Sequence, residues 1–115
     1  MRGATTLDED TPEQVNKRVQ ELVTAMLEEN GLASDSLVSI LFTATPDVHS
    51  GFPATAARGL GLDDVPLMGA QELDVAGALP LCVRVMMHVE TDRPRHQVNH
   101  VYLHGARSLR PDLAE

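Results

Sequence analysis

A charged residue, Arg84, lies in the middle of the most continuous apolar segment of the chain, Leu81-Cys82-Val83-Arg84-Val85-Met86-Met87-His88-Val89. β-Branched and other apolar residues dominate this segment, which predicts a strand in the core of a sheet. The interior of a sheet does not accept a guanidinium group unless an anion compensates its charge. We therefore expect an anionic group beside Arg84, supplied either by the protein itself or by a ligand.

The alternation of this predicted strand defines two faces, because successive side chains of a strand point to opposite sides. The face that we expect to pack in the core carries Val83, Val85, Met87 and Val89. The opposite face carries Cys82, Arg84, Met86 and His88. This second face is too apolar to be freely solvated, so it is expected to line a cavity or a subunit interface. The alternative is an internal salt bridge between Arg84 and a neighbouring carboxylate.

Length and composition restrict the class of protein. We expect the 115 residues to form one domain, residues 1–115, which needs neither a disulfide nor a metal to fold. The single cysteine, Cys82, and the lack of a signal peptide or of an apolar stretch of about 18 residues predict a cytoplasmic protein without a membrane span. A net charge of −8 without a basic cluster argues against nucleic-acid binding.

The capping motifs and apolar patterns of the other segments predict two helices and three further strands. Thr11-Pro12-Glu13-Gln14 has the residues of a capping box, so a helix should begin there and end at Asn30-Gly31. A second, short helix is expected over residues 53–60. Strands are expected over residues 37–43, 65–68 and 98–104, and the last of these should carry His100, Tyr102 and His104 on one face. This order predicts an α+β fold with helices layered on one face of a sheet.

Common catalytic motifs are missing from the sequence. No histidine or cysteine pair has the spacing of a metal site, and no serine or cysteine lies in a nucleophile motif, so neither a metal nor a cofactor is expected. What remains is a scattered set of groups suited to binding anions and hydroxyls: Arg2, Arg58, Glu72, Arg84, Tyr102 and Arg110. Taken singly, each also fits an ordinary surface or packing role.

The segments around these residues resemble one known family. They are Arg2-Gly3-Ala4-Thr5-Thr6, Ala44-Thr45-Pro46-Asp47, Phe52-Pro53-Ala54, Val65-Pro66-Leu67, Gln71-Glu72-Leu73-Asp74-Val75, Cys82-Val83-Arg84-Val85-Met86-Met87, His100-Val101-Tyr102-Leu103 and Leu109-Arg110-Pro111-Asp112-Leu113. Their order and spacing, over nearly the whole chain, resemble the AroH-class chorismate mutases. These enzymes convert chorismate to prephenate in the synthesis of phenylalanine and tyrosine, without a cofactor and without a covalent intermediate.

The resemblance implies a role for each candidate residue. By analogy, Arg84 donates to the ether oxygen of chorismate, and Glu72 accepts a hydrogen bond from the ring hydroxyl. Arg2 and Tyr102 match residues that hold the enolpyruvyl carboxylate. The family forms a homotrimer with a pseudo-barrel and sites at its interfaces, so Phe52 and Arg58 would come from the neighbouring subunit. A mobile tail that covers the pocket is matched by Leu109 and Arg110.

The sequence departs from the family pattern in three ways. Only Met1 precedes Arg2 where family members have several strand residues, so the first strand is either missing or shortened at its start. Gly69 replaces a cysteine beside the ring hydroxyl, with Met68 where a threonine is common, and Thr55 replaces a lysine at the pocket rim. We expect an active enzyme that binds its substrate more weakly. A non-catalytic trimeric module that binds a small carboxylate effector, or an enzyme for another cyclic acid, stays an alternative.

Overall fold

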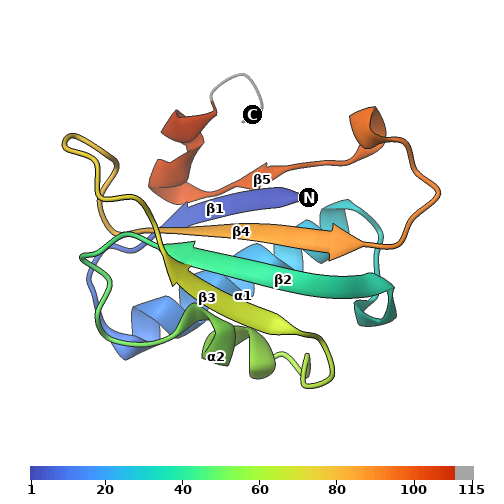
Figure 1. Cartoon of the computed structure of the whole chain (residues 1–115), viewed down its shortest axis with the longest axis horizontal. Helices are drawn as coiled ribbons and strands as arrows, with labels where there is room; N and C mark the ends of the chain where they lie inside the picture. Colours follow the sequence, from blue (N-terminus) through green and yellow to red (C-terminus); the bar gives the residue numbers. More distant parts are fainter. Residues whose placement is uncertain (111–115) are drawn as a thin grey trace.

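The computed structural model describes residues 1–110, which form a five-stranded sheet and two α-helices (Figure 1). In chain order the strands and α-helices are β1 (Arg2–Thr6), α1 (Pro12–Glu29), β2 (Leu37–Ala44), α2 (Pro53–Arg58), β3 (Leu67–Gln71), β4 (Cys82–Val89) and β5 (Val101–Tyr102). Three short 3-10 helices are η1 (Ser34–Ser36), η2 (Arg95–Gln97) and η3 (His104–Leu109). None of the helices within residues 1–110 is long and apolar enough to cross a membrane.

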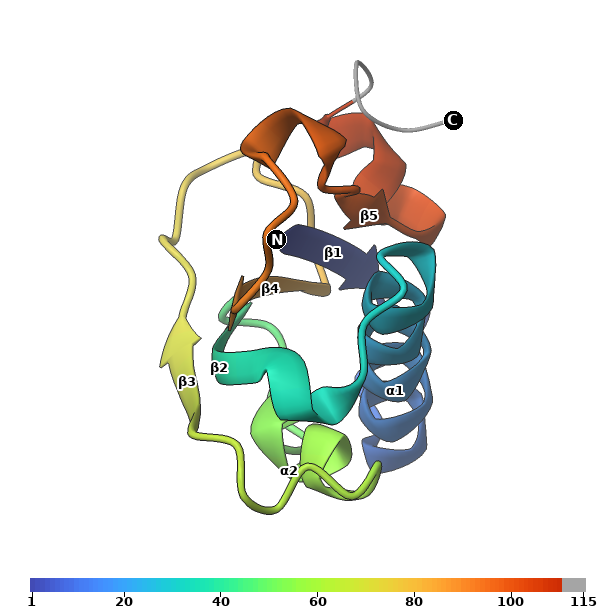
Figure 2. The same cartoon turned by 90° about the vertical axis from the view of Figure 1, so that its right-hand side faces the viewer.

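The sheet is mixed, with the strand order β3-β2-β4-β1-β5. Strand β4 lies in its centre and pairs antiparallel with both β1 and β2, whereas the outer pairs, β1 with β5 and β2 with β3, are parallel. Figure 2 shows α1 and α2 on the same side of the sheet. The predicted α+β fold, a mixed sheet with helices on one face, is thus confirmed, and β1 is present.

The central strand has the two faces that its alternation predicts. Val83, Val85 and Met87 are buried against the helices, and Val89 is partly buried beside them. Helix α1 approaches β1 closely at Gly3, where an added Cβ would lie 2.5 Å from the Met26 sulfur. The opposite face carries neither α1 nor α2. Its Arg84, Met86 and His88 on β4 are exposed, whereas Ala4 and Tyr102 are buried with Ala106 of η3.

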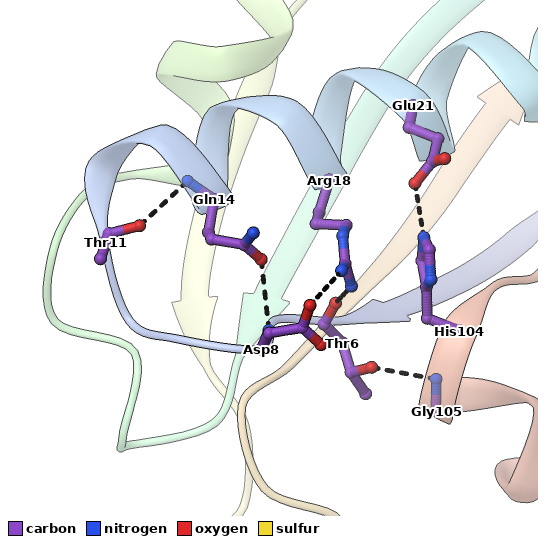
Figure 3. Close-up of polar contacts among 8 residues, drawn as sticks. All are labelled: Thr6, Asp8, Thr11, Gln14, Arg18, Glu21, His104 and Gly105. Carbon is purple, nitrogen blue, oxygen red and sulfur yellow. Dashed lines mark hydrogen bonds and ion pairs between the residues drawn. The ribbon is translucent and has the colours of Figure 1, made fainter.

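Helix α1 begins where the capping motif predicts, but one capping contact differs. The Thr11 hydroxyl accepts a hydrogen bond from the backbone N–H of Gln14 at 3.2 Å. The Gln14 side chain does not return to Thr11. It accepts from the backbone N–H of Asp8 instead (Figure 3). Gln14 therefore fastens the loop between β1 and α1.

The predicted boundaries at the two outer strands were wrong. Strand β3 runs over Leu67–Gln71 rather than over residues 65–68, because it pairs with the whole second half of β2. The last strand is only Val101–Tyr102. His104 has a positive φ of 52° and bonds to Glu21 of α1 at 2.8 Å (Figure 3), so it does not share a face with Tyr102. The chain turns into η3 at His104, which ends the strand early.

Candidate active site

Arg84 lies on the face of β4 opposite α1 and α2, between Thr43 of β2 and Ala4 of β1 in the register of the sheet. Its Nη1 atom is 3.6 Å from Oε2 of Glu72, and 47 % of its side chain is exposed. The sequence left two alternatives for Arg84, an internal carboxylate or a cavity that takes a ligand. The structure contains both, because Glu72 lies close and the guanidinium still faces an open hollow.

This hollow has a volume of about 210 Å³ and collects residues from five parts of the chain. It is lined by Arg2, Gly3, Leu41, Thr43, Glu72, Arg84, Val85, Met86 and Tyr102. Four of the predicted site residues, Arg2, Glu72, Arg84 and Tyr102, thus lie together although 100 positions separate the first from the last. They place two permanent cations, one carboxyl group and one phenol around a small space.

Glu72 is held by the neighbouring strand. It follows the end of β3, and its backbone N–H donates to the Ala44 carbonyl at 2.8 Å. Its Oε2 atom accepts a hydrogen bond from the Thr43 hydroxyl at 2.8 Å. Thr43 was not among the predicted site residues. The alternation of β2 places Thr43 on the face opposite Phe42, but only the register between β2 and β4 shows that it lies across from Arg84.

Arg2 and Tyr102 lie on the adjacent pair of strands. The backbone N–H of Arg2, at the start of β1, donates to Nδ1 of His100 at 3.0 Å. Tyr102 on β5 is 6 % exposed and packs with Ala4, Ala106 and Leu109. The phenol therefore has a fixed position at the wall of the hollow.

The segment that carries Leu109 and Arg110 is anchored on the first strand and on α1. Thr6 accepts a hydrogen bond from the backbone N–H of Gly105 at 3.0 Å, and His104 bonds to Glu21 (Figure 3). Leu109 packs on the Tyr102 cluster, and the charge of Arg110 contributes to lowering the pKa of His100. Both predicted residues thus end next to the Arg2 side of the hollow, whereas the Pro111-Asp112-Leu113 part of the matched motif lies outside the described residues.

Phe52 and Arg58 lie elsewhere, at a second hollow of about 870 Å³ beside α2 and β3. Thr55 and Gly69, two of the positions that depart from the family pattern, also line it, and Met68 is exposed on the neighbouring strand. Phe52 is 76 % exposed, which is unusual for a large apolar side chain. One chain therefore presents the predicted site residues in two separate groups.

The hollow around Arg84 offers binding and electrostatics rather than nucleophilic or metal chemistry. Burial raises the pKa of the nearby Cys82 thiol to about 11, so this thiol is a poor nucleophile at neutral pH. Within residues 1–110 no three histidine, cysteine or acidic side chains are grouped as metal ligands. Two guanidinium groups opposite a carboxylate suit a small ligand with two negative charges and a hydroxyl.

Comparisons with known proteins agree with this geometry. The model of the family described as chorismate mutase type I matches residues 1–113. The chain is 48 % identical over 114 residues to chorismate mutase AroH of Thermus thermophilus, covering 98 % of this chain and 93 % of that protein. It is 46 % identical over 115 residues to chorismate mutase AroH of Bacillus subtilis, covering 99 % and 91 %.

A solved structure has the same fold. The chorismate mutase from Clostridium thermocellum superimposes with a TM-score of 0.92 at 45 % sequence identity, over 94 % of this chain and 96 % of that one. The family model and both relatives extend over nearly the whole chain, including the strands that surround the hollow. The chain therefore belongs to the type I chorismate mutase family.

Proposed function

We propose that the protein, as a type I chorismate mutase, converts chorismate to prephenate with Arg84 as its central catalytic residue. In this [3,3] rearrangement the ether carbon–oxygen bond breaks as a carbon–carbon bond forms, and negative charge develops on the ether oxygen. A fixed cation next to that oxygen stabilises the transition state more than the ground state. The observation that carries the proposal is Arg84 in the open hollow, 3.6 Å from Glu72.

Glu72 then orients the substrate and takes no proton from it. Its carboxylate accepts from the Thr43 hydroxyl at 2.8 Å, which leaves the other oxygen for the ring hydroxyl of chorismate. The same contact keeps Glu72 from closing fully on Arg84. Thr43 therefore acts as a positioning residue between the two charged groups.

The substrate's carboxylate is held by Arg2 and Tyr102 across the hollow from Glu72. Holding the carboxylate and the hydroxyl at the same time selects the folded conformer of chorismate in which the reacting carbons are close. With a net charge of −8 the chain as a whole repels a dianion, so these arginines dominate locally.

The complete site is proposed to form between subunits of a homotrimer. Phe52 and Arg58 line the second hollow, so a neighbouring copy would have to bring them to Arg84, while Leu109 and Arg110 close the Arg2 side. Exposed apolar side chains suited to such a contact are Met86 of β4 and Met68 of β3, on the face of Arg84, and Phe52 at the second hollow. Docking on the face of Arg84 would also remove water from its guanidinium and strengthen its electrostatic effect.

The reaction is tested by the loss of chorismate absorbance with purified protein, using Arg84→Ala as the control. Turnover that depends on Arg84 supports the proposal. Binding of chorismate without turnover would instead identify a non-catalytic module that holds a carboxylate effector.

The shared site is tested by mixing two inactive variants, Arg84→Ala and Arg58→Ala, unfolding them together and refolding them. Random assembly of equal amounts places an intact Arg84 beside an intact Arg58 in about a quarter of the sites of a cyclic trimer. We therefore expect the mixture to regain about a quarter of the wild-type activity, whereas each variant refolded alone stays inactive. A mixture without recovery, or a fully active monomer in sedimentation, would exclude the shared site.

A further inference from the structure

The parallel pairing between β1 and β5 is interrupted next to Arg2. The register pairs Gly3 with Val101 and Ala4 with Tyr102, and one more step would place Arg2 opposite His100. In such a ladder the Asn99 carbonyl would accept the hydrogen bond of the Arg2 N–H. In this structure that carbonyl accepts from Nδ2 of Asn30 at 3.0 Å, and the Arg2 N–H donates to the His100 ring instead.

Asn30 keeps this part of the chain turned away from β1. Its Oδ1 atom accepts from the Asn99 N–H at 2.8 Å, and its Nδ2 atom also donates to the Met26 carbonyl at 2.7 Å. Asn30 is 1 % exposed at the end of α1. Both backbone groups of Asn99 are thus held by the end of α1 rather than by β1.

The imidazole of His100 takes the place of the missing carbonyl. Its Nδ1 atom accepts the Arg2 N–H at 3.0 Å, so Nδ1 must carry a free lone pair and the proton must be on Nε2. On the other side of Arg2, the backbone of Met1 exchanges two hydrogen bonds with Met87 of β4. The start of β1 is therefore held on one side by backbone hydrogen bonds to Met87 and on the other side by the His100 ring, which can be protonated.

The surroundings of His100 favour the neutral ring. Burial lowers the pKa of His100 below its usual value, and the positive charges of Arg2, the N-terminal ammonium and Arg110 lower it further. Within residues 1–110 these three cations, from the start of β1 and from the residue after η3, are the charged groups that shift the pKa of the ring. The hydrogen bond to Arg2 is thus intact at neutral pH.

We propose that His100 is a positioning residue for substrate binding: its neutral imidazole sets the place of Arg2, and protonation of the ring withdraws that support in mildly acidic solution. The inference rests on the proposed role of Arg2 in holding the substrate's carboxylate. A protonated imidazole donates at both nitrogens, so Nδ1 then faces the Arg2 N–H without a lone pair. Because the Met1 and Met87 bonds remain, Arg2 shifts while the strand stays folded.

The test compares KM and kcat for two substitutions at His100. His100→Asn retains an acceptor near the position of Nδ1 but does not titrate, whereas His100→Leu removes the acceptor. The loss of one ordinary hydrogen bond predicts a rise in KM of roughly fivefold for His100→Leu, with kcat nearly unchanged. His100→Asn should keep a KM close to that of the wild type. An unchanged KM in His100→Leu would overturn the proposal.

The pH profile gives a second, sharper comparison. Because the pKa of His100 is lowered from 6.5, the KM of the wild type should rise only below about pH 6.5, where the ring becomes protonated. In His100→Asn the KM should stay flat over the same range. The matched control is His96→Asn in η2, an exposed histidine outside the hollow, which should retain the wild-type profile. A wild-type profile in His100→Asn would refute the switch.

Two measurements distinguish a failure of the His100 proposal from a failure of the proposed chorismate mutase reaction. Two-bond ¹⁵N–¹H spectra of the imidazole should find the Nε2–H tautomer of His100 with Nδ1 as the acceptor, whether or not the protein turns over chorismate. Calorimetric binding of chorismate replaces KM if turnover is absent. An Nδ1–H tautomer at pH 7.5 overturns the positioning role, whereas absent turnover with the expected tautomer and binding overturns only the reaction.

Discussion

Replacing Thr43 by valine tests how the two charged groups of the site are kept apart. The Thr43 hydroxyl donates to Oε2 of Glu72 at 2.8 Å, and the same oxygen is 3.6 Å from Nη1 of Arg84. Valine has nearly the shape of threonine but no hydroxyl, so the substitution removes this hydrogen bond with little change in packing. The freed carboxylate should then move onto Arg84 and form a tighter ion pair.

The magnitude follows from the burial of the two partners. A hydrogen bond to a charged group contributes about 1.5–3 kcal/mol when it is shielded from water. The Glu72 side chain is 25 % exposed, so water replaces part of the lost bond and about 1–2 kcal/mol remains. That range corresponds to a loss of roughly five- to thirtyfold in kcat/KM. Most of the loss should appear in kcat, because in the proposed mechanism the guanidinium engaged by Glu72 is the group that stabilises the transition state.

The assay is the steady-state loss of chorismate, measured for Thr43→Val, for the control Thr43→Ser and for both in a Glu72→Ala background. Serine retains the hydroxyl, so Thr43→Ser should stay within about threefold of the wild type. If Thr43 acts through Glu72, Thr43→Val should cost almost nothing once Glu72 is absent. Full activity of Thr43→Val, or an equal loss in both backgrounds, would refute the reasoning.

Two further substitutions and one labelling experiment have distinct expected outcomes. Arg84→Lys keeps the charge but loses the forked donor, and we expect turnover to fall by about 10²–10³ while circular dichroism stays unchanged; near-normal turnover would contradict its role. Arg18 is 7 % exposed and bonds to the Thr6 carbonyl and to Asp8, so Arg18→Ala should lower the free energy of unfolding by about 1–3 kcal/mol in urea titrations. An unchanged urea midpoint would show that water replaces these bonds. With a pKa of about 11, roughly one Cys82 thiol in a thousand is ionised at pH 8, so labelling by iodoacetamide should be far slower in the folded than in the urea-unfolded protein. Equal labelling rates would contradict the burial of Cys82.

The predictions that hold are those that depend on neighbours along the chain. The start of α1 follows from Thr11 and Pro12, and the two faces of β4 follow from its alternation, because capping and side-chain direction are local properties. Arg18 was missed, although it lies three residues after Val15 and four before Leu22, on the buried stripe of the helix. A charged residue on such a stripe is accepted only when a carbonyl or carboxylate meets it, which the pattern alone does not reveal.

The candidate site likewise contains residues that the sequence named and residues that only the structure revealed. The matched segments named Arg2, Glu72, Arg84 and Tyr102 in advance, and the tertiary structure brings these four together. Thr43 and His100 received no role from the sequence, because their importance depends on which atoms lie across from them on other strands. Whether Phe52 and Arg58 join the same site depends on quaternary structure, that is, on the contact between copies of the chain.

The sequence by itself thus determined the element types, the core face of β4 and the family to which the chain belongs. Only the tertiary structure decided that β5 is short, that Asn30 takes the Asn99 carbonyl, and that His100 therefore supports Arg2. The physical reason is that periodicity and capping act within a few residues, whereas a hydrogen-bond ladder is a competition among groups far apart in the chain. A backbone group that is turned toward one partner is turned away from another, and that outcome depends on the assembled fold.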